Sequence, residues 1–419
     1  MTSWASGTFA SLNNRHFRTL WVGSLFAFIG FFMSTIVQAV VAFDITGKNG
    51  SVGLVVFAQG ISQLVLGPFG GALADRVSKR LIIFVCQAVM TAAFFGMAVL
   101  IAAGEVTILW LSLGSFIIGA AFSFLGPARQ AFVGEILDQN RRGNAIALTQ
   151  VGLNGSRIIG PLLAGIMLSV SWLDAAGAYF LMSAFYVASM ACTFFLPGTK
   201  ANVSNARSVL GDIGSGLGYV WANRHLRLLI LSFVLIIMLG FPYVIVLPGL
   251  VKNEFHRGNG SISVLYLVNA SGGLIASLIV AGLADSRRAT NIYTGMCAIF
   301  AISLASMAIM PNFWALAGTM FVVGFGGGGF QTLNGAVIAH SAEPAYYGRV
   351  MSLTFLAFAA FGVIALPLGF LADQVGERAT LGVMGAMAGA VVVGFFELSR
   401  SGNPSATVAV PSAAGGGSR

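Results

Sequence analysis

Charged side chains are the scarcest class of residue in this sequence of 419 amino acids. They make up 8% of the chain, and 57% of the residues are hydrophobic. A soluble globular protein carries about 25% charged residues, and the mean hydropathy here is +0.89. A single soluble core cannot hide that much apolar surface, so most of the chain is expected to lie in lipid.

Cysteine is also rare, and catalytic motifs are missing. The three cysteines lie inside apolar runs and show no disulfide framework or metal-binding spacing, so we expect no metal and no cofactor. The sequence has no nucleophile elbow, no phosphate-binding loop and no zinc-protease motif. No catalytic residue is therefore predicted, and the chain is not expected to be an enzyme. The polar N-terminal stretch does not resemble a cleaved signal peptide.

The sequence does contain twelve apolar runs of spanning length, since about 20 residues cross about 30 Å of hydrocarbon. We number them as spans 1 to 12, with centres near Ala27, Ile61, Ala92, Ile118, Ile158, Tyr186, Ile236, Leu274, Phe300, Val323, Ala360 and Met387. The longest polar break follows span 6 and divides the chain into two halves of six spans. We therefore predict an all-α membrane protein with twelve transmembrane helices in two six-helix bundles.

The domain boundaries follow from that break. Residues 1–197 are expected to form the N-terminal bundle, 198–225 a cytoplasmic linker, 226–399 the C-terminal bundle and 400–419 a disordered tail. Within the linker, Val209–Ala222 is predicted to be an amphipathic surface helix. The tail is rich in Ser, Ala, Gly and Pro, a composition that cannot bury a core.

Basic residues are distributed unevenly between the two membrane faces. If the N-terminus is cytoplasmic, sixteen of the 22 Lys and Arg residues fall on the inner side and four on the outer side. The remaining two, Arg129 and Arg157, fall within spans. This asymmetry follows the positive-inside rule and predicts a multi-pass protein of the plasma membrane (the bacterial inner membrane) with both termini cytoplasmic. It also explains the net charge of +9 without nucleic acid.

A short phrase recurs at every third span. Span 2 ends in GGALADRVSKR, span 8 in AGLADSRR and span 11 in GFLADQVGER, while span 5 carries GPLLAGIML, which is similar to the GPFGGALAD of span 2. Spans 2 and 5 cross the membrane in opposite directions, as do spans 8 and 11. The pattern therefore predicts inverted three-helix repeats within each bundle, an architecture of transporters.

The stretch from Gly71 to Arg80 resembles the signature loop between helices 2 and 3 of the major facilitator superfamily, although Ser78 replaces a common glycine. The resemblance implies a gate on the inner face, formed by Gly71, Asp75, Arg76 and Arg80. An aspartate at a helix end can accept hydrogen bonds from the first amides of a neighbouring helix, and the arginines can pair with acids on adjacent loops. The alternative is a plain topology signal at the membrane surface.

Two further stretches resemble the same family. Residues 152–165, centred on Gly160 and Pro161, resemble the helix-5 motif of its antiporters, so both residues are expected to take part in gating. Residues 126–137 resemble the drug-exporter branch that includes macrolide efflux proteins and the enterobactin exporter. The resemblance covers about residues 12–400. It implies a secondary transporter that exports amphipathic small molecules or drugs by alternating access, driven by the proton gradient.

Arg157 is the most informative residue within a span. Span 5 begins near Gly143, so at 1.5 Å per residue Arg157 lies about 21 Å deep, past the midplane. A charge there costs at least about 2.5–3.5 kcal/mol on insertion scales and is usually retained because it faces a cavity or a partner. With Gln150 and Asn154 it forms a polar stripe that we expect to line a substrate cavity. The alternative is a strut bonded to backbone carbonyls.

Span 10 contains the run GFGGGGF at residues 324–330. It formally matches a dinucleotide fingerprint, but it follows no strand and lies within a span, so we reject that function. Glycines allow helices to pack closely or to bend; both alternatives stay open, and Gly327 is expected to take part in gating. Gln331 and Asn334 follow on the same helix and are expected to line the cavity, although each can instead bond a neighbouring helix.

Acids that can carry a proton are scarce. Asp44 ends span 1 on the outside and Glu135 ends span 4 on the inside; both are candidates for proton coupling, and both can be simple boundary charges. We expect a monomer whose partners are a small-molecule substrate, protons and membrane lipid. Arg157 favours an anionic metabolite such as a siderophore, whereas 34 Phe and 15 Met favour a permissive apolar pocket. A membrane scaffold without transport activity is the remaining alternative.

Overall fold

The structure is a computed structural model that describes residues 10–170, 174–198, 209–283, 286 and 288–400, with a few side chains inside these ranges left undescribed. The described residues form helices and connecting turns. In chain order the helices are η1 (Ala10–Asn13), α2 (Arg15–Thr46), α3 (Asn49–Arg76), α4 (Lys79–Ala102), α5 (Ile108–Ile136), α6 (Gln139–Ser169), α7 (Asp174–Phe194), α8 (Val209–Ala222), α9 (Arg224–Gly240), α10 (Tyr243–Gly249), η2 (Leu250–Glu254), α11 (Asn259–Ala281), α12 (Ala289–Ser306), η3 (Met307–Ile309), α13 (Phe313–Ser341), α14 (Pro344–Val375) and α15 (Glu377–Arg400).

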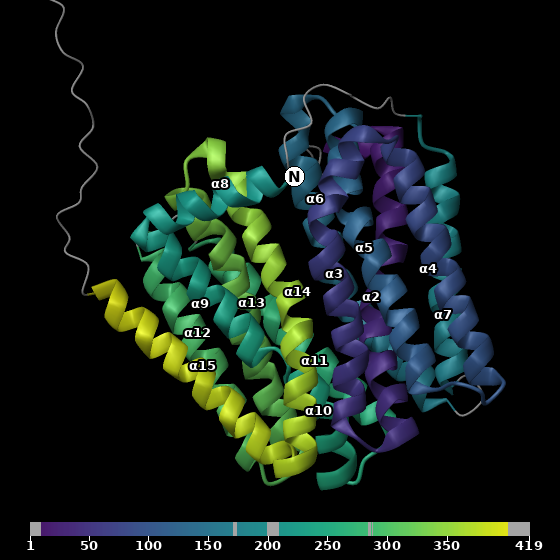
Figure 1. Cartoon of the computed structure of the whole chain (residues 1–419), viewed down its shortest axis with the longest axis vertical. Coiled ribbons are helices and arrows are strands. Elements are labelled where there is room, and N and C mark those ends of the chain that lie inside the picture. Colours follow the sequence, from purple (N-terminus) through teal and green to yellow (C-terminus); the bar gives the residue numbers. More distant parts are fainter. Residues whose placement is uncertain (1–9, 171–173, 199–208, 284–285, 287, 401–419) are drawn as a thin grey trace, which may run out of the picture.

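Twelve segments of the described chain are long and apolar enough to cross a membrane, which confirms the predicted number. Figure 1 shows two bundles side by side, α2–α7 in purple, blue and blue-teal and α9–α15 in teal, green and yellow, with α8 across one end. The predicted surface helix is α8, with the bounds expected for it. The predicted tail, apart from its first residue, lies outside the described residues.

The seventh span differs from a simple helix. α9 ends at Gly240, and the path turns at Phe241 and Pro242 before it continues through α10 and the π-helical turn η2. Proline has no amide hydrogen and clashes with the preceding turn, so Pro242 cannot continue the hydrogen-bond ladder of α9. The span therefore crosses the membrane in two pieces with a joint between them.

We name the two ends of the bundles after the charge asymmetry of the sequence. The inner end carries the loop between α3 and α4 and the helix α8; the outer end carries the loop between α2 and α3. Helix caps lie at both ends. At the inner end the side chain of Asn14 accepts from the amides of His16 and Phe17, and at the outer end that of Thr107 accepts from the amide of Trp110, which satisfies donors that a helix start leaves free.

Small residues bring equivalent helices together in both bundles. A Cβ added to Gly119 of α5 would lie 2.5 Å from the carbonyl oxygen of Gln59 in α3. In the second bundle, Gly324 of α13 packs directly on the carbonyl of Asn269 in α11. Spans 2 and 4 therefore pair in the same manner as spans 8 and 10, as expected for two halves with the same internal arrangement.

Two helix pairs join the bundles. α3 lies along α14, and Figure 1 shows them adjacent at the boundary between the bundles. A Cβ on Gly60 of α3 would lie 2.5 Å from the Cα of Gly362 in α14, so the backbones touch. The second pair is α6 and α11, where a Cβ on Gly165 would lie 2.6 Å from the Cβ of Ser263. The first pair places span 2 against span 11, and the second places span 5 against span 8.

Candidate transport pathway between the two bundles

The polar stripe predicted on span 5 lies on one face of α6. Gly160 packs on α2 and Gly165 packs on α11; at about 100° per residue, Arg157 projects between these two contacts. Exposure falls along this face from the inner end outward: Gln150 is exposed, Arg157 is partly buried, and Pro161 is buried. The face is thus open toward the inner end and closed beyond Arg157.

The side chain of Asn154, the third residue of the predicted stripe, is not described. Its predicted place in the cavity therefore stays a prediction, and the stripe rests on its neighbours one turn before and one turn after it.

Arg157 and a second arginine lie against neighbouring turns of α2. The guanidinium carbon of Arg157 is 5.5 Å from the centre of the Phe32 ring, and that of Arg129 in α5 is 5.4 Å from the centre of the Phe28 ring. Both are cation–π distances. Arg129 is 8% exposed, and its side chain donates to the hydroxyl of Ser189 at 3.5 Å. Its Nε has no hydrogen-bond partner among the described residues.

Acidic residues do not share the positions of these arginines within the spans. All 13 Asp and Glu residues of the sequence lie near the ends of the spans or in the segments between them. The middle of the first bundle therefore carries positive charge only. Because a charge inside a membrane protein is costly unless it is paired or hydrated, the partly buried Arg157, with no described acid facing it, would favour the entry of an anion and disfavour that of a cation.

The predicted cavity residues of span 10 differ from each other. Gln331 is partly exposed, and its Nε2 donates to the carbonyl oxygen of Gly327 in the same helix at 3.0 Å. Asn334 is 2% exposed, and its Oδ1 has no hydrogen-bond partner among the described residues. Asn334 thus keeps an unused acceptor inside the second bundle, whereas one N–H of the Gln331 amide is already bonded within its own helix.

Gly327 is the least confined glycine of the run on α13. The nearest neighbour of a Cβ there would be Cδ2 of Phe300, at 3.6 Å, whereas a Cβ on Gly326 would lie 2.6 Å from the amide nitrogen of Phe300. Gly324 and Gly328 pack directly on the backbone of α11. Since α13 passes through the run without a break, these contacts show close packing at the neighbours of Gly327, and the predicted role of Gly327 in gating stays a prediction.

Gly160 and Pro161 lie where α6 crosses α2. A Cβ on Gly160 would lie 2.8 Å from the Cβ of Phe32 and 2.9 Å from the amide nitrogen of Met33. Pro161 is buried, and α6 continues through it to Ser169. The pair therefore holds α6 against α2 at the level of the arginine-on-phenylalanine contacts. The predicted role of the pair in gating stays a prediction.

The inner loop after α3 is tied into its own bundle. Lys79 is 5% exposed, and its ammonium nitrogen lies 2.5 Å from the carboxylate of Glu135 in α5. Arg80 donates to the carbonyl oxygen of Phe194 at the end of α7, where the helix dipole favours a cation. Among the described contacts Arg80 thus joins α4 to α7 instead of pairing with an acid on a neighbouring loop. Paired with a buried lysine, Glu135 supports this loop, and its predicted role in proton coupling stays a prediction.

The remaining residues of the predicted inner gate give less information. Arg76 is exposed in the last turn of α3. The exposure of Gly71 and the side chain of Asp75 are not described, so the bond predicted for Asp75 and the gating role of Gly71 stay predictions.

A polar network at the outer end crosses between the bundles. Asp373, near the end of α14, accepts hydrogen bonds from the backbone amides of Asn49 at 2.7 Å and Gly50 at 2.8 Å, the first residues of α3. Glu377, the first residue of α15, accepts from the side-chain amides of Asn49 at 3.1 Å and Asn253 at 2.8 Å. An aspartate thus caps a helix of the opposite bundle here, in the manner predicted for the inner end.

Sequence reasoning missed the function of this network. It identified the phrase around Asp373 as a copy of the inner one but assigned no role to Asp373, Glu377 or Asn49. The inverted repeat was the available signal, because it relates the inner end of span 2 to the outer end of span 11. A cap expected at one end therefore has a counterpart at the other.

Asp44 belongs to the same outer network. Its carboxylate forms an ion pair with Lys252 of η2 and accepts from the side-chain amide of Asn259 at 3.1 Å. Both partners belong to the second bundle, so Asp44 holds the two bundles together. The predicted role of Asp44 in proton coupling stays a prediction.

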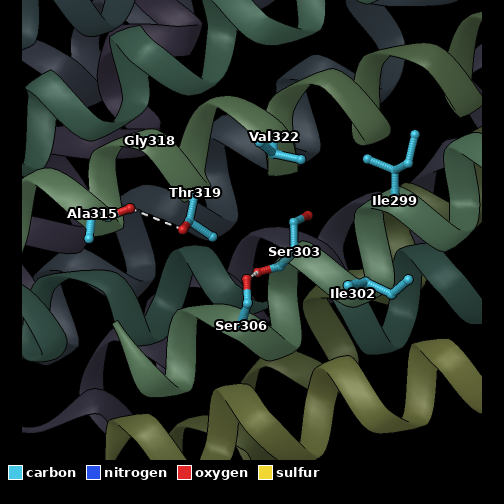
Figure 2. Close-up of a pocket in the computed structure, with 8 residues that line it drawn as sticks. All are labelled: Ile299, Ile302, Ser303, Ser306, Ala315, Gly318, Thr319 and Val322. Carbon is cyan, nitrogen blue, oxygen red and sulfur yellow. Dashed lines mark hydrogen bonds between the residues drawn. The ribbon is translucent and has the colours of Figure 1, made fainter. Parts of the chain in front are cut away.

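A groove of about 470 Å³ lies away from this pathway, between α12 and α13 (Figure 2). Ile302 on its rim is 70% exposed, which places the groove on the outside of the second bundle. Its hydroxyls are bound within their own helices: that of Thr319 donates to the carbonyl oxygen of Ala315 at 3.0 Å and that of Ser306 to Ser303 at 2.7 Å. The groove therefore offers a mainly apolar surface to lipid and little for recognising a polar substrate.

The described side chains do not gather into a metal site. No group of three His, Cys, Asp or Glu residues is close enough within the described chain, and the three cysteines are free thiols. We therefore assign no residue to a metal or a cofactor.

The sequence of this chain is similar to those of known proteins. Residues 20–365 match the family model described as Major Facilitator Superfamily. The chain is 23% identical over 371 residues to macrolide efflux protein A of Streptococcus pyogenes, which covers 86% of this chain and 90% of that protein. It is 26% identical over 275 residues to multidrug resistance protein MdtH of Klebsiella pneumoniae, which covers 64% of each.

Two other similarities point the same way. The chain is 22% identical over 361 residues to the staphyloferrin A transporter of Staphylococcus aureus, covering 83% of this chain and 87% of that protein. Among solved structures, the nucleoside transporter NupG has a TM-score of 0.75 at 15% identity and covers 91% of this chain and 99% of that one. At this identity the last similarity shows the fold alone.

Proposed function

This chain belongs to the Major Facilitator Superfamily, and we propose that it is a secondary active transporter that exports amphipathic small molecules or drugs by alternating access, driven by the proton gradient. The family is one of transporters and is generally non-enzymatic. Two of the similar proteins are a macrolide efflux protein and a multidrug resistance protein. These similarities support export as the direction of transport.

One observation supports the mechanism most directly. The face of α6 that carries Arg157 is exposed toward the inner end at Gln150 and buried beyond Arg157 at Pro161, while polar contacts join the two bundles at the outer end. A pathway that is accessible from one side and closed on the other is one of the two states that alternating access requires.

We further propose that the protein lies in the bacterial inner membrane with both termini in the cytoplasm. The excess of Lys and Arg on the inner side supports this orientation. Export then means movement from the inner end, where the stripe on α6 is exposed, to the outer end.

Inside-out vesicles that contain the purified protein test this function. A proton gradient is imposed across the vesicle membrane, and candidate compounds are added one at a time. The proposal predicts uptake that requires the gradient and that releases protons in return. Vesicles without protein and vesicles with a collapsed gradient are the controls. Uptake of no compound from a broad panel, with protein shown to be folded, would reject the proposed function.

A second candidate, export of an anionic metabolite, is favoured by the charges in the first bundle. Arg129 and Arg157 lie against α2, and every acid of the chain is near a span end or between spans. The staphyloferrin A transporter is among the similar proteins. The two candidates differ in the charge of the substrate, which the panel of compounds can separate directly.

A further inference from the structure

Two carboxylates close the outer end of the interface between the bundles. Asp373 accepts from the first two backbone amides of α3, and Glu377 accepts from the side-chain amides of Asn49 and Asn253. These contacts involve five residues, which we call the outer lock: Asn49, Gly50, Asn253, Asp373 and Glu377. All four donors are N–H groups, so they need acceptors, and an ionised carboxylate is the strongest acceptor that a side chain offers.

Helix geometry directs both carboxylates to the same place. α14 ends at Val375 and α15 begins at Glu377, with Gly376 between them at φ +89°. Glycine adopts this backbone angle without strain, and the tight turn brings Asp373 and Glu377 from two helices to the start of α3. There the positive end of the α3 dipole adds to the attraction for negative charge.

Asn49 is the centre of the outer lock. It is 2% exposed, and it donates its backbone N–H to Asp373 and its side-chain N–H to Glu377. Its Oδ1 has no hydrogen-bond partner among the described residues. Glu377 is 7% exposed, so in this closed arrangement its carboxylate depends on the protein N–H donors and not on water.

The charged groups around the outer lock are engaged in other pairs. Lys252 pairs with Asp44, and Arg378 donates to Glu254 at 2.7 Å. Lys48, which precedes α3, is exposed. Within the described side chains, the partners of Asp373 and Glu377 are neutral amides. The strength of the outer lock therefore depends on the charge of these two acids, because no described cation fixes that charge.

From this arrangement we propose that Asp373 and Glu377 form a proton-sensitive lock on the outer gate. When both are ionised, they hold α3 against α14 and keep the outer end closed. When the two carboxylates take up protons from the outer side, the negative charge that faces the start of α3 is lost. A neutral carboxyl group is a weaker hydrogen-bond acceptor than a carboxylate, so the outer end opens. The role of the outer lock in transport rests on the proposed function. The lock itself concerns the outer gate and not the substrate.

A distance measurement across the outer end tests the outer lock. Spin labels are placed on Glu105→Cys in the first bundle and Pro311→Cys in the second, both exposed at the outer end, with the three native cysteines replaced by serine. The purified protein, without substrate, is then titrated from about pH 7 to about pH 4, where free carboxyl groups take up protons. The expected result is a population with a longer label-to-label distance that grows as the pH falls.

The double variant Asp373→Asn and Glu377→Gln should show this longer distance already at about pH 7. Charge-assisted hydrogen bonds of this kind predict a rise of about tenfold or more in the ratio of open to closed protein. The matched control is Asp174→Asn, because Asp174 at the same outer end accepts from Ala176 at 2.7 Å within its own helix. The control should keep the distances of the unmodified protein at every pH.

The outcomes distinguish the two proposals. If the double variant keeps the distances and the pH response of the unmodified protein, the outer lock is refuted, whatever the vesicles show. If vesicles show no gradient-driven uptake but the double variant opens and loses its pH response, the outer lock stands and the proposed function fails. Equal opening in the double variant and in Asp174→Asn would also refute the outer lock, since it would indicate a general effect of removing acids.

Discussion

Lys79 and Glu135 form an ion pair whose ammonium nitrogen and carboxylate oxygen are 2.5 Å apart at the inner end of the first bundle. The side chain of Lys79 is 6% exposed and that of Glu135 is 34% exposed. A buried cation needs a partner more than an exposed one does. The pair therefore fixes the start of α4 against the end of α5.

We predict that Glu135→Gln destabilises the first bundle by about 1–3 kcal/mol, because the amide leaves the buried ammonium with a weaker partner. The measurement is the melting temperature of the purified protein in detergent. Lys79→Met combined with Glu135→Gln should recover part of the loss, since the buried cation that lost its carboxylate is then gone. A double variant that is less stable than either single variant would contradict the prediction.

The glycine run on α13 leads to a second prediction. Gly324→Ala should lower the folded yield after detergent extraction strongly, because its Cβ would overlap the carbonyl of Asn269 in α11. Gly327→Ala should be tolerated within about 0.5 kcal/mol, since its Cβ would meet only ordinary contacts at 3.6 Å or more. The two alanine variants differ only in position, so each is the control of the other. Equal yields would show that the backbones of α11 and α13 do not pack as described.

Hydropathy alone was sufficient to predict the number of spans and the bounds of α8, because both depend on composition and on local periodicity. It did not predict the joint between α9 and α10, although Pro242 was visible in the sequence. A proline ends a helix in some membrane spans and only bends it in others, since neighbouring groups can satisfy the freed carbonyl. α3, α6 and α14 each continue through a proline, so the residue type does not decide the outcome.

The site shows the same limit at longer range. The place of Arg157 within its span could be read from the sequence, but its ring partner could not, because Phe32 lies on a helix 125 positions earlier in the chain. For Asp373 the sequence showed the residue and its likeness to Asp75, yet its partners Asn49 and Gly50 lie more than 300 positions away. Local patterns predict elements and repeats, whereas partners depend on how the helices pack.

A third prediction concerns orientation in the membrane. A cysteine at Glu105 should react with a membrane-impermeant maleimide added to intact cells, and a cysteine at Arg141 should react only after the membrane is opened. Both positions are exposed and lie at opposite ends of the first bundle, and the excess of basic residues puts the Arg141 end inside. The reverse labelling pattern would overturn the assignment of inner and outer ends, and with it the direction of export.

The last prediction separates the two candidate substrates at Arg157. If its charge binds an anion, Arg157→Gln should raise the KM for an anionic substrate about tenfold or more, and Arg157→Lys should recover only part of the loss. Lysine keeps the charge but lacks the planar fork that grips two oxygen atoms and stacks on an aromatic ring, here that of Phe32. A neutral or cationic substrate should be affected little.

If Arg157 is instead a strut between α6 and α2, both substitutions should lower the folded yield, and transport of every substrate should fall by the same factor. The deciding measurement is the transport of one anionic and one cationic compound by both variants, each normalised to folded protein. Ser156→Ala is a matched control on the same helix turn, because its buried hydroxyl donates to the carbonyl oxygen of Gly152 within α6. A selective loss for the anion, absent in the control, is the outcome that the acid-free centre of the first bundle predicts; equal losses for both compounds would leave Arg157 as a strut.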